Sequence, residues 1–259
     1  MTMPDRFFPT PSILNFRDYG GYATACGGQV KWGRLFRSSD HSIASDDDLA
    51  LLDTLDVSAV IDLRSPQERV MRPSRRNPGR SAEVLSVPAA AAAAPHVAAM
   101  EGPSSPQMVR ERLIQYYRES PFRETQKRGL QLYFETIARI DGPTLVHCAA
   151  GKDRTGIAAA LLLAALGVER DHVFADYLLT NEAGSLEERA SAFAYSVSHH
   201  FGHAPSDAVL RVALSVDPDY LNAAFDAITT RCGDLSRYLD DVLGIDATRF
   251  RGIASRLLA

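Results

Sequence analysis

The chain has 259 residues, of which 46% are hydrophobic and 23% are charged, and its formal net charge is -4. This composition excludes the low hydrophobicity and high charge that are typical of disorder, so a folded protein is expected. The negative net charge also excludes a protein whose main role is to bind nucleic acid. Any phosphate group is therefore expected to bind at a local site and not along an extended basic surface.

Short apolar runs in the first part of the chain predict strands. Residues 13–38 alternate such runs with paired glycines, which is typical of a hairpin-like β segment. Ser45, with Asp48 three residues later, predicts a capping box at the start of a helix. Residues 57–64 predict a buried strand that ends in polar residues, and residues 82–88 predict a second strand.

Residues 89–109 contain six consecutive alanines and no clean period, which predicts a mobile excursion over a site. Apolar residues then recur at helical spacing over 108–140. A strand is expected at 143–148, followed by a helix over 154–167 that is apolar nearly all round and therefore central.

The remainder of the chain is expected to be helical. Helix start signals stand at Ser185, at Asp217-Pro218 and at Asp246. Strands first and helices afterwards predict a single α/β domain over residues 1–259, with a central, mostly parallel sheet flanked by helices and a helical carboxyl-terminal part.

The cysteines and the apolar runs bear on the compartment. Cys26, Cys148 and Cys232 are odd in number and widely spaced, which favours neither a disulfide framework nor a thiolate zinc site. No signal peptide is recognised at the start, and the longest apolar run is too short to span a bilayer. We expect a cytoplasmic protein with no integral membrane association; export without a signal peptide and the oligomeric state stay open.

The stretch LVHCAAGKDRTG, residues 145–156, joins the predicted central strand to the predicted central helix. Backbone amides there and the positive end of the helix dipole would bind a dianion. The same field favours the thiolate of Cys148, which makes it a candidate nucleophile. Arg154 can grip two phosphoryl oxygens with its planar fork, and the Thr155 hydroxyl can donate to the sulfur.

Two alternatives were weighed for this stretch. An isolated cysteine after an apolar strand is usually just buried, but the glycines, lysine and arginine around Cys148 favour the chemical role. A nucleotide-binding loop is excluded, because Val146 stands where its first glycine is needed and Asp153 follows Lys152.

Cysteine, five residues, then Arg-Thr-Gly, with His147 in front, resembles the signature of the cysteine-dependent protein tyrosine phosphatase superfamily. With NFRDYGGY, LFRSSD, VIDLRSPQE and DYLLTN, the chain is similar to the bacterial tyrosine and phosphoinositide phosphatases whose loop reads His-Cys-x-x-Gly-Lys-Asp-Arg-Thr-Gly, and these matches span residues 14–182. The resemblance implies the phosphatase fold and implies no metal or organic cofactor. It also implies that Cys148 forms a phosphocysteine, that Arg154 grips the phosphoryl group, and that a cradle is built from Ala149, Ala150, Gly151, Lys152 and Thr155.

The general acid must be found outside a Trp-Pro-Asp loop, because the single tryptophan, Trp32, is followed by glycine. The resemblance implies that Asp153, inside the loop, acts as acid and then as base. The alternative is that Asp153 only balances the charges of Lys152 and Arg154.

Further residues are expected to support the site. Asp62, at the end of a predicted strand, is the rival acid, and Asp18 is a weaker one. Both are expected to orient arginines such as Arg64 or Arg17 instead. By the resemblance, His147 organises the loop through hydrogen bonds.

The expected substrate is a phosphorylated protein, with phosphotyrosine first, or a phosphoinositide. By the resemblance, Lys152 would meet a second phosphate; the alternative is that it only raises the local positive potential. Phosphoserine and phosphothreonine stay open. The resemblance implies a helical lid over residues 89–127; the alternative is a surface loop and helix with no gating role. Two rival functions are kept: an inactive phosphate-binding module, and a sulfur-transfer or arsenate-reductase-like enzyme.

The histidines at 199, 200 and 203 are not expected to bind a metal. Gly202 and Pro205 break the helix that their spacing would require, and no glutamate completes the set.

Overall fold

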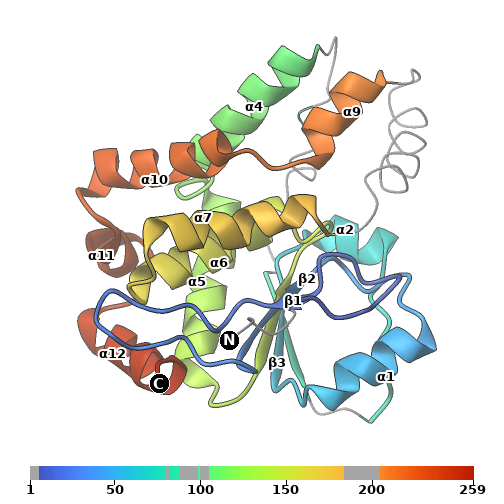
Figure 1. Ribbon diagram of the computed structural model, residues 1–259, viewed down its shortest axis with the longest axis horizontal. Coiled ribbons are helices and arrows are strands. Elements are labelled where there is room, and N and C mark those ends of the chain that lie inside the picture. The colour runs from blue at the N-terminus through green and yellow to red at the C-terminus, as the bar shows by residue number, and fades with distance from the viewer. Residues whose placement is uncertain (1–5, 80–81, 88–98, 100–104, 184–204) are drawn as a thin grey trace.

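A computed structural model describes residues 6–79, 82–87, 99, 105–183 and 205–259 (Figure 1). Its five-stranded sheet has the order β1-β2-β5-β3-β4. β1 pairs antiparallel with β2 and the other three pairings are parallel, which confirms the mostly parallel sheet. The strands are β1 (Arg17–Asp18), β2 (Leu35–Ser38), β3 (Ala59–Asp62), β4 (Glu83–Ser86) and β5 (Thr144–His147).

The register brings the carboxyl ends of three strands together. In β5, the central strand, His147 lies opposite Ser38 of β2 and Asp62 of β3. Cys148 follows directly, so it leaves the sheet between two neighbouring strand ends. In open α/β sheets this edge is where ligands bind.

Helices follow the strands along most of the described residues, and the sequence signals at Ser45, Asp217 and Asp246 are confirmed. Ser45 makes both bonds of its capping box with Asp48, and Asp217 and Asp246 cap their helices through side-chain oxygens. The helices are α1 (Asp46–Thr54), α2 (Pro66–Met71), α4 (Pro106–Glu119), α5 (Glu124–Arg139), α6 (Asp153–Ala165), α7 (Arg170–Leu178), α9 (Asp207–Leu214), α10 (Pro218–Cys232), α11 (Leu235–Arg237) and α12 (Ala247–Leu257), with short turns at η1 (Leu179–Asn181) and η2 (Tyr238–Val242).

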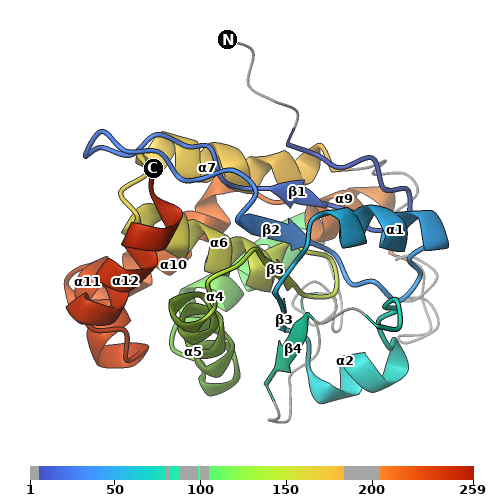
Figure 2. The same ribbon diagram turned by 90° about the horizontal axis from the view of Figure 1, so that it is seen from below.

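The two faces of the sheet are covered by different helices (Figure 2). On one face, Phe36, Val60 and Leu145 pack with residues of α1. On the other, Leu35, Ile61 and Val146 join the larger core formed with α5, α6 and the carboxyl-terminal helices. Successive strand residues alternate between the faces, as the pleat requires.

Helix α6 is central, as its apolar sequence predicts. Every residue from Asp153 to Leu163 is buried. A helix that is apolar all round can be satisfied only inside a core. α6 therefore holds the loop that precedes it against the middle of the sheet.

Some sequence predictions fall partly or wholly outside the residues that the structure describes. The hairpin-like segment over 13–38 is confirmed as β1 and β2, with an isolated bridge between Ala23 and Gln29. The expected excursion over 89–109 lies mostly outside the described residues, and α4 begins near its end. The helix start at Ser185 and the histidines at 199–203 also lie outside them. Within the described part of the chain, no helix is both long and apolar enough to cross a bilayer.

Candidate active site

The loop from Cys148 to Lys152 connects β5 to α6 and has the features of an anion cradle. Cys148 is only 3% exposed, and no side chain caps the amino terminus of α6. The amides of Ala149, Ala150 and Gly151 donate no hydrogen bond to any described residue. Uncapped amides at a helix amino terminus favour a bound anion.

Gly151 allows the loop to turn tightly against β2. Its φ of +65° lies in the left-handed region. A Cβ at this position would approach the Ser38 carbonyl oxygen to 2.4 Å, which is closer than real Cβ atoms come. Glycine is therefore required both by its dihedral angle and by the close approach of the backbone.

Arg154 is held by a carboxylate that reaches it from α2. Its Nη1 and Nη2 donate to Glu68 at 2.7 and 2.6 Å, and Nη1 also donates to the Leu63 carbonyl at 3.1 Å. Burial disfavours the charge of Arg154, but the Glu68 carboxylate and the nearby Cys148 outweigh it and raise the pKa of Arg154. The guanidinium is therefore charged and fixed in direction before any anion arrives.

Glu68 does two jobs in the same region. Its side chain accepts from the Ser65 amide at 2.8 Å, which completes the capping box of α2. Burial raises the pKa of Glu68, but the Arg154 guanidinium dominates and lowers it overall. The start of a short helix thus positions the arginine of the loop.

A second buried network holds the carbonyl of Gly151. This oxygen accepts from Asn15 Nδ2 at 2.7 Å and from Arg37 Nη2 at 3.0 Å. Arg37 and Arg17 share the carboxylate of Asp176 in α7, at 2.8 and 3.2 Å. Arg17 also donates to the Asn15 side chain. Three quoted segments, NFRD, LFRSSD and DYLLTN, therefore meet behind the loop.

Asp153 and Lys152 face the helices that pack against the loop. Asp153 accepts a 2.9 Å hydrogen bond from the Tyr117 hydroxyl of α4. Lys152 donates to the carbonyls of Ala213 and Ser215, at the end of α9, at 2.6 and 3.2 Å. Lys152 Nζ also lies 3.5 Å from Asp153 Oδ1. Both residues are 2% exposed.

Two buried donors beside the cradle have no protein partner among the described residues. They are Arg154 Nε and the hydroxyl of Thr155. The hydrogen bond expected from Thr155 to the Cys148 sulfur is therefore not formed in this structure. A buried polar group without a partner is costly, and a bound oxyanion would supply acceptors.

The supporting residues lie around the same strand ends. Asp62 is paired with Arg64 through two of its nitrogens, at 2.7 and 3.0 Å. Burial raises the pKa of Asp62, but His147 and Arg64 outweigh it and lower the pKa to about 2. His147 stacks on His41, and its Nδ1 lies 3.2 Å from the Cys148 carbonyl oxygen.

Asp18 binds backbone amides beside β1. Its carboxylate accepts from the amides of Gly20 and Gly33 at 2.7 and 2.6 Å and so fixes the turns beside β1. It does not orient Arg17, as the sequence had led us to expect, because Asp176 takes that arginine.

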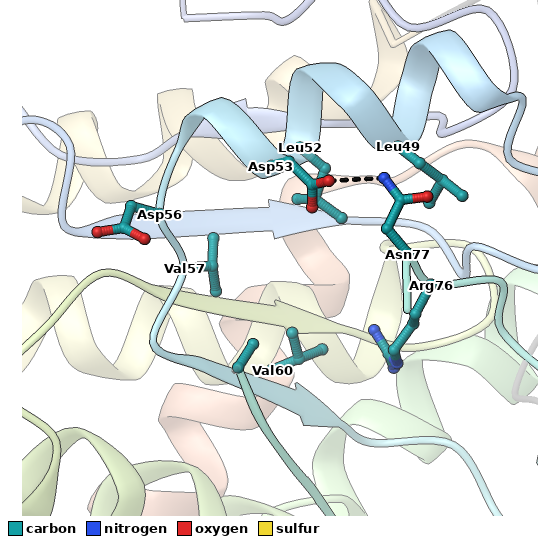
Figure 3. A pocket seen from close by; sticks show the side chains of 9 residues that line it. Leu49, Leu52, Asp53, Asp56, Val57, Val60, Arg76 and Asn77 are labelled. Carbon is teal, nitrogen blue, oxygen red and sulfur yellow. Dashed lines mark hydrogen bonds between the residues drawn. The ribbon is translucent and has the colours of Figure 1, made fainter. Parts of the chain in front are cut away.

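A separate hollow lies between α1 and the sheet (Figure 3). It is bordered by Leu49, Leu52 and Val60, and by an Asp53–Asn77 hydrogen bond of 2.6 Å. Its volume of about 70 Å³ is well below the 300 Å³ or more that ligand pockets usually have. Cys148 does not line it.

Sequence reasoning missed several groups that build this site. Glu68 belongs to a readable Ser-x-x-Glu signal at residues 65–68, but its partner Arg154 is 86 residues away. Asp176 and Arg37 stand inside quoted motifs without an assigned role. Nothing in the local pattern of Tyr117 pointed to Asp153.

The chain is similar to known proteins over most of its length. A family model described as "Tyrosine phosphatase family" matches residues 8–259. A Cupriavidus necator protein named as a tyrosine-protein phosphatase is 36% identical over 247 residues, covering 93% of this chain and 85% of its own length. "Triple specificity protein phosphatase PtpB" of Mycobacterium tuberculosis is 34% identical over 274 residues, covering 94% and 97%.

The chain is also similar to a solved structure. The TpbA protein of P. aeruginosa is 18% identical, with coverage of 79% of this chain and 96% of its own, and its TM-score is 0.24.

Proposed function

Because the chain belongs to the tyrosine phosphatase family, we propose that it hydrolyses phosphate monoesters through a phosphocysteine on Cys148. The observation that carries this proposal is the cradle itself. Three loop amides without described partners, an uncapped helix terminus and a buried, pre-oriented Arg154 surround one buried cysteine.

In the first step, the Cys148 thiolate attacks phosphorus. The S–P bond forms while the bond from phosphorus to the leaving oxygen breaks. Arg154 Nε and the loop amides hold the equatorial oxygens, where charge develops. Asp153 gives its proton to the leaving oxygen, so the alcohol or phenol departs neutral.

In the second step, water attacks the phosphocysteine. The S–P bond breaks, Asp153 takes the water proton, and phosphate leaves with the thiolate restored. Cys148 and Asp153 therefore return to their starting states. Asp62 is a poor rival for the acid role, because its lowered pKa keeps it ionised above about pH 2.

Phosphotyrosine is the first proposed substrate class, and phosphoserine, phosphothreonine and phosphoinositides are included as further classes. The chain resembles a relative whose name states triple specificity. α4 is proposed as part of a lid within residues 89–127. In support, Tyr116 of α4 is close enough to Arg154, Asp153 and Cys148 for their charges to affect its pKa, which burial raises.

Lys152 would serve a second phosphate only by exchanging its partners. In this structure its ammonium is held by two carbonyls at the end of α9. Replacement of these bonds by a substrate phosphate would loosen α9. Lipid activity is therefore proposed to depend on movement of that helix.

The test is phosphate release from a phosphotyrosine peptide and from phosphoinositide vesicles, with reducing agent and chelator present. Wild type, Cys148→Ser and the matched control Cys26→Ser would be compared; Cys26 is exposed. Turnover is expected in wild type and in the Cys26 variant, and none in the Cys148 variant.

Three other outcomes would contradict the proposal. Tight phosphate binding without turnover by wild type would favour the inactive binding module. Turnover that survives in Cys148→Ser would exclude the phosphocysteine, and arsenate reduction or sulfur transfer without phosphate release would point to the third class of function.

A further inference from the structure

A chain of two tyrosine hydroxyls ends on the proposed general acid. Tyr177 Oη donates to Tyr117 Oη at 2.8 Å, and Tyr117 Oη donates to Asp153 Oδ1 at 2.9 Å. Both tyrosines are 0% exposed and Asp153 is 2% exposed. The three groups come from α7, α4 and α6, so elements far apart in sequence meet at one carboxyl group.

The direction of these two hydrogen bonds follows from which groups carry a proton to donate. A phenol has one proton to donate and can also accept, whereas a carboxylate only accepts. Because Tyr177 donates to Tyr117, the Tyr117 proton is directed at Asp153. Burial, together with the charge of Asp153, raises the pKa of both tyrosines, so both stay protonated donors at neutral pH.

We propose that Tyr117 is a positioning residue for Asp153 and that Tyr177 orients it. The proposal rests on the acid role given to Asp153 above. A hydrogen bond on Oδ1 fixes the rotation of the carboxyl group and therefore the place of the second oxygen. Displacement of a reacting group by about 1 Å can cost on the order of 100-fold in rate.

The packing around the two tyrosines holds their rings in place. A Cβ on Gly156 would lie 3.0 Å from the Tyr177 ring, so the glycine of the Arg-Thr-Gly sequence gives this ring its place. The Tyr117 ring packs edge-on against Tyr177 and tilted against Tyr220. Neither ring can move its hydroxyl oxygen away without disturbing a packed core.

The position of α4 is thereby linked to the acid. Arg110 near the start of α4 pairs with Asp217 and Asp219 beside α10. Tyr117 stands two turns further along the same helix. Any displacement of α4 from α10 would move the donor of Asp153, so the acid is placed only when this helix is docked.

Other titratable groups also lie around Asp153 and contribute to the pH dependence of its ionisation. Lys152 Nζ lies 3.5 Å from the same oxygen that Tyr117 binds. The charge of Asp153 also acts on Tyr116 of α4 and on Tyr220 of α10, whose pKa burial raises to about 12. These groups stay unchanged in a Tyr117→Phe variant, so the difference reports the lost hydroxyl.

The test compares two aryl phosphates that differ in leaving group. p-Nitrophenyl phosphate needs little help from an acid, whereas phenyl phosphate needs a proton on the departing oxygen. Tyr117→Phe is expected to lower kcat on phenyl phosphate by about 10- to 100-fold and on p-nitrophenyl phosphate by less than about 3-fold. Tyr177→Phe keeps the hydrogen bond from Tyr117 to Asp153, so its kcat on phenyl phosphate is expected to lie between the values of wild type and Tyr117→Phe.

A pH profile and a double variant separate positioning from packing. A hydrogen bond donated to a carboxylate favours its ionised form, so its loss moves the alkaline limb of kcat to higher pH although the plateau falls. In an Asp153→Asn background, Tyr117→Phe should cost nothing more on phenyl phosphate. Tyr133→Phe is the matched control, because it removes a buried 2.7 Å Tyr–Tyr hydrogen bond with Tyr19 that does not reach Asp153.

The proposal is overturned if Tyr117→Phe slows both substrates equally, if the alkaline limb stays in place, or if the loss persists in the Asp153→Asn background. If Asp153→Asn slowed phenyl phosphate no more than p-nitrophenyl phosphate, the acid role of Asp153 and this proposal would both be refuted. Turnover that depends on Cys148 would still stand. Failure of the proposed function itself would show earlier, as a wild type that turns over neither aryl phosphate.

Discussion

Asp176→Asn is the sharpest test of the network behind the loop. One carboxylate serves two guanidinium groups, with Arg17 Nε at 3.2 Å and Arg37 Nη1 at 2.8 Å. All three side chains are at most 2% exposed. The variant keeps shape and volume but leaves two buried cations without a countercharge. Burial and the charge of Arg37 already lower the pKa of Arg17 to about 10, which shows how closely the cations are placed.

The size of the effect follows from burial. Removing one partner of a buried ion pair costs about 3–5 kcal/mol, because the remaining charge is uncompensated. In a chain of this size each kcal/mol lowers the melting temperature by about 2–4 °C, so we expect a decrease of roughly 6–20 °C. Arg37 also holds the Gly151 carbonyl, so KM for a phosphotyrosine peptide should rise as well.

The assay is chemical and thermal unfolding followed by circular dichroism, with kinetics on the same samples. Glu124→Gln is the matched control, since that carboxylate also pairs with two cations, Lys127 and Arg128, but on the surface. Its midpoint should stay at the wild-type value. An Asp176→Asn midpoint equal to that of Glu124→Gln would refute the energetic argument.

Three further predictions concern the same site. Glu68→Gln keeps an oxygen for the cap of α2 but loses two charge-assisted bonds to Arg154, so kcat/KM on phosphotyrosine should fall on the order of 100-fold; a fall below about 3-fold would contradict the clamp role. Gly151→Ala should lower stability by at least about 1–2 kcal/mol and abolish phosphate binding by calorimetry, because the left-handed φ and the Ser38 carbonyl both oppose a Cβ; unchanged binding would argue against the cradle. The arginines lower the pKa values of Asp176 and Glu68 in the folded protein. Both carboxylates therefore stabilise the fold fully above their unfolded-state pKa values near 4, and this stabilisation is lost as the pH falls through their folded-state pKa values. Acid unfolding of Asp176→Asn should accordingly be less steep than that of wild type.

The sequence predicts elements whose signals are local. Alternation and β-branched runs predicted β3 and β5, and the signals at Ser45 and Asp217 predicted helix starts correctly. The apolar run after Arg154 predicted a central helix, because such a surface must be buried.

Pairings across the fold could not be predicted in this way. Glu68 meets Arg154 only because the start of α2 lies beside the start of α6 in space. Asp18 was expected to orient Arg17, but the topology brings Asp176 to that arginine from 159 residues away. Side-chain partners depend on which strand ends become neighbours, and no periodicity encodes that choice.

The Asp176 network also sets when the site can form as the protein is made. Arg37 leaves the ribosome long before its carboxylate, which is 139 residues further along. At about 5–20 residues per second this delay is on the order of ten seconds. A nascent chain that ends before Asp176 already carries Cys148 but lacks the anchor of its loop. Cys148 is therefore translated first, and its loop gains this anchor only after α7 has been added.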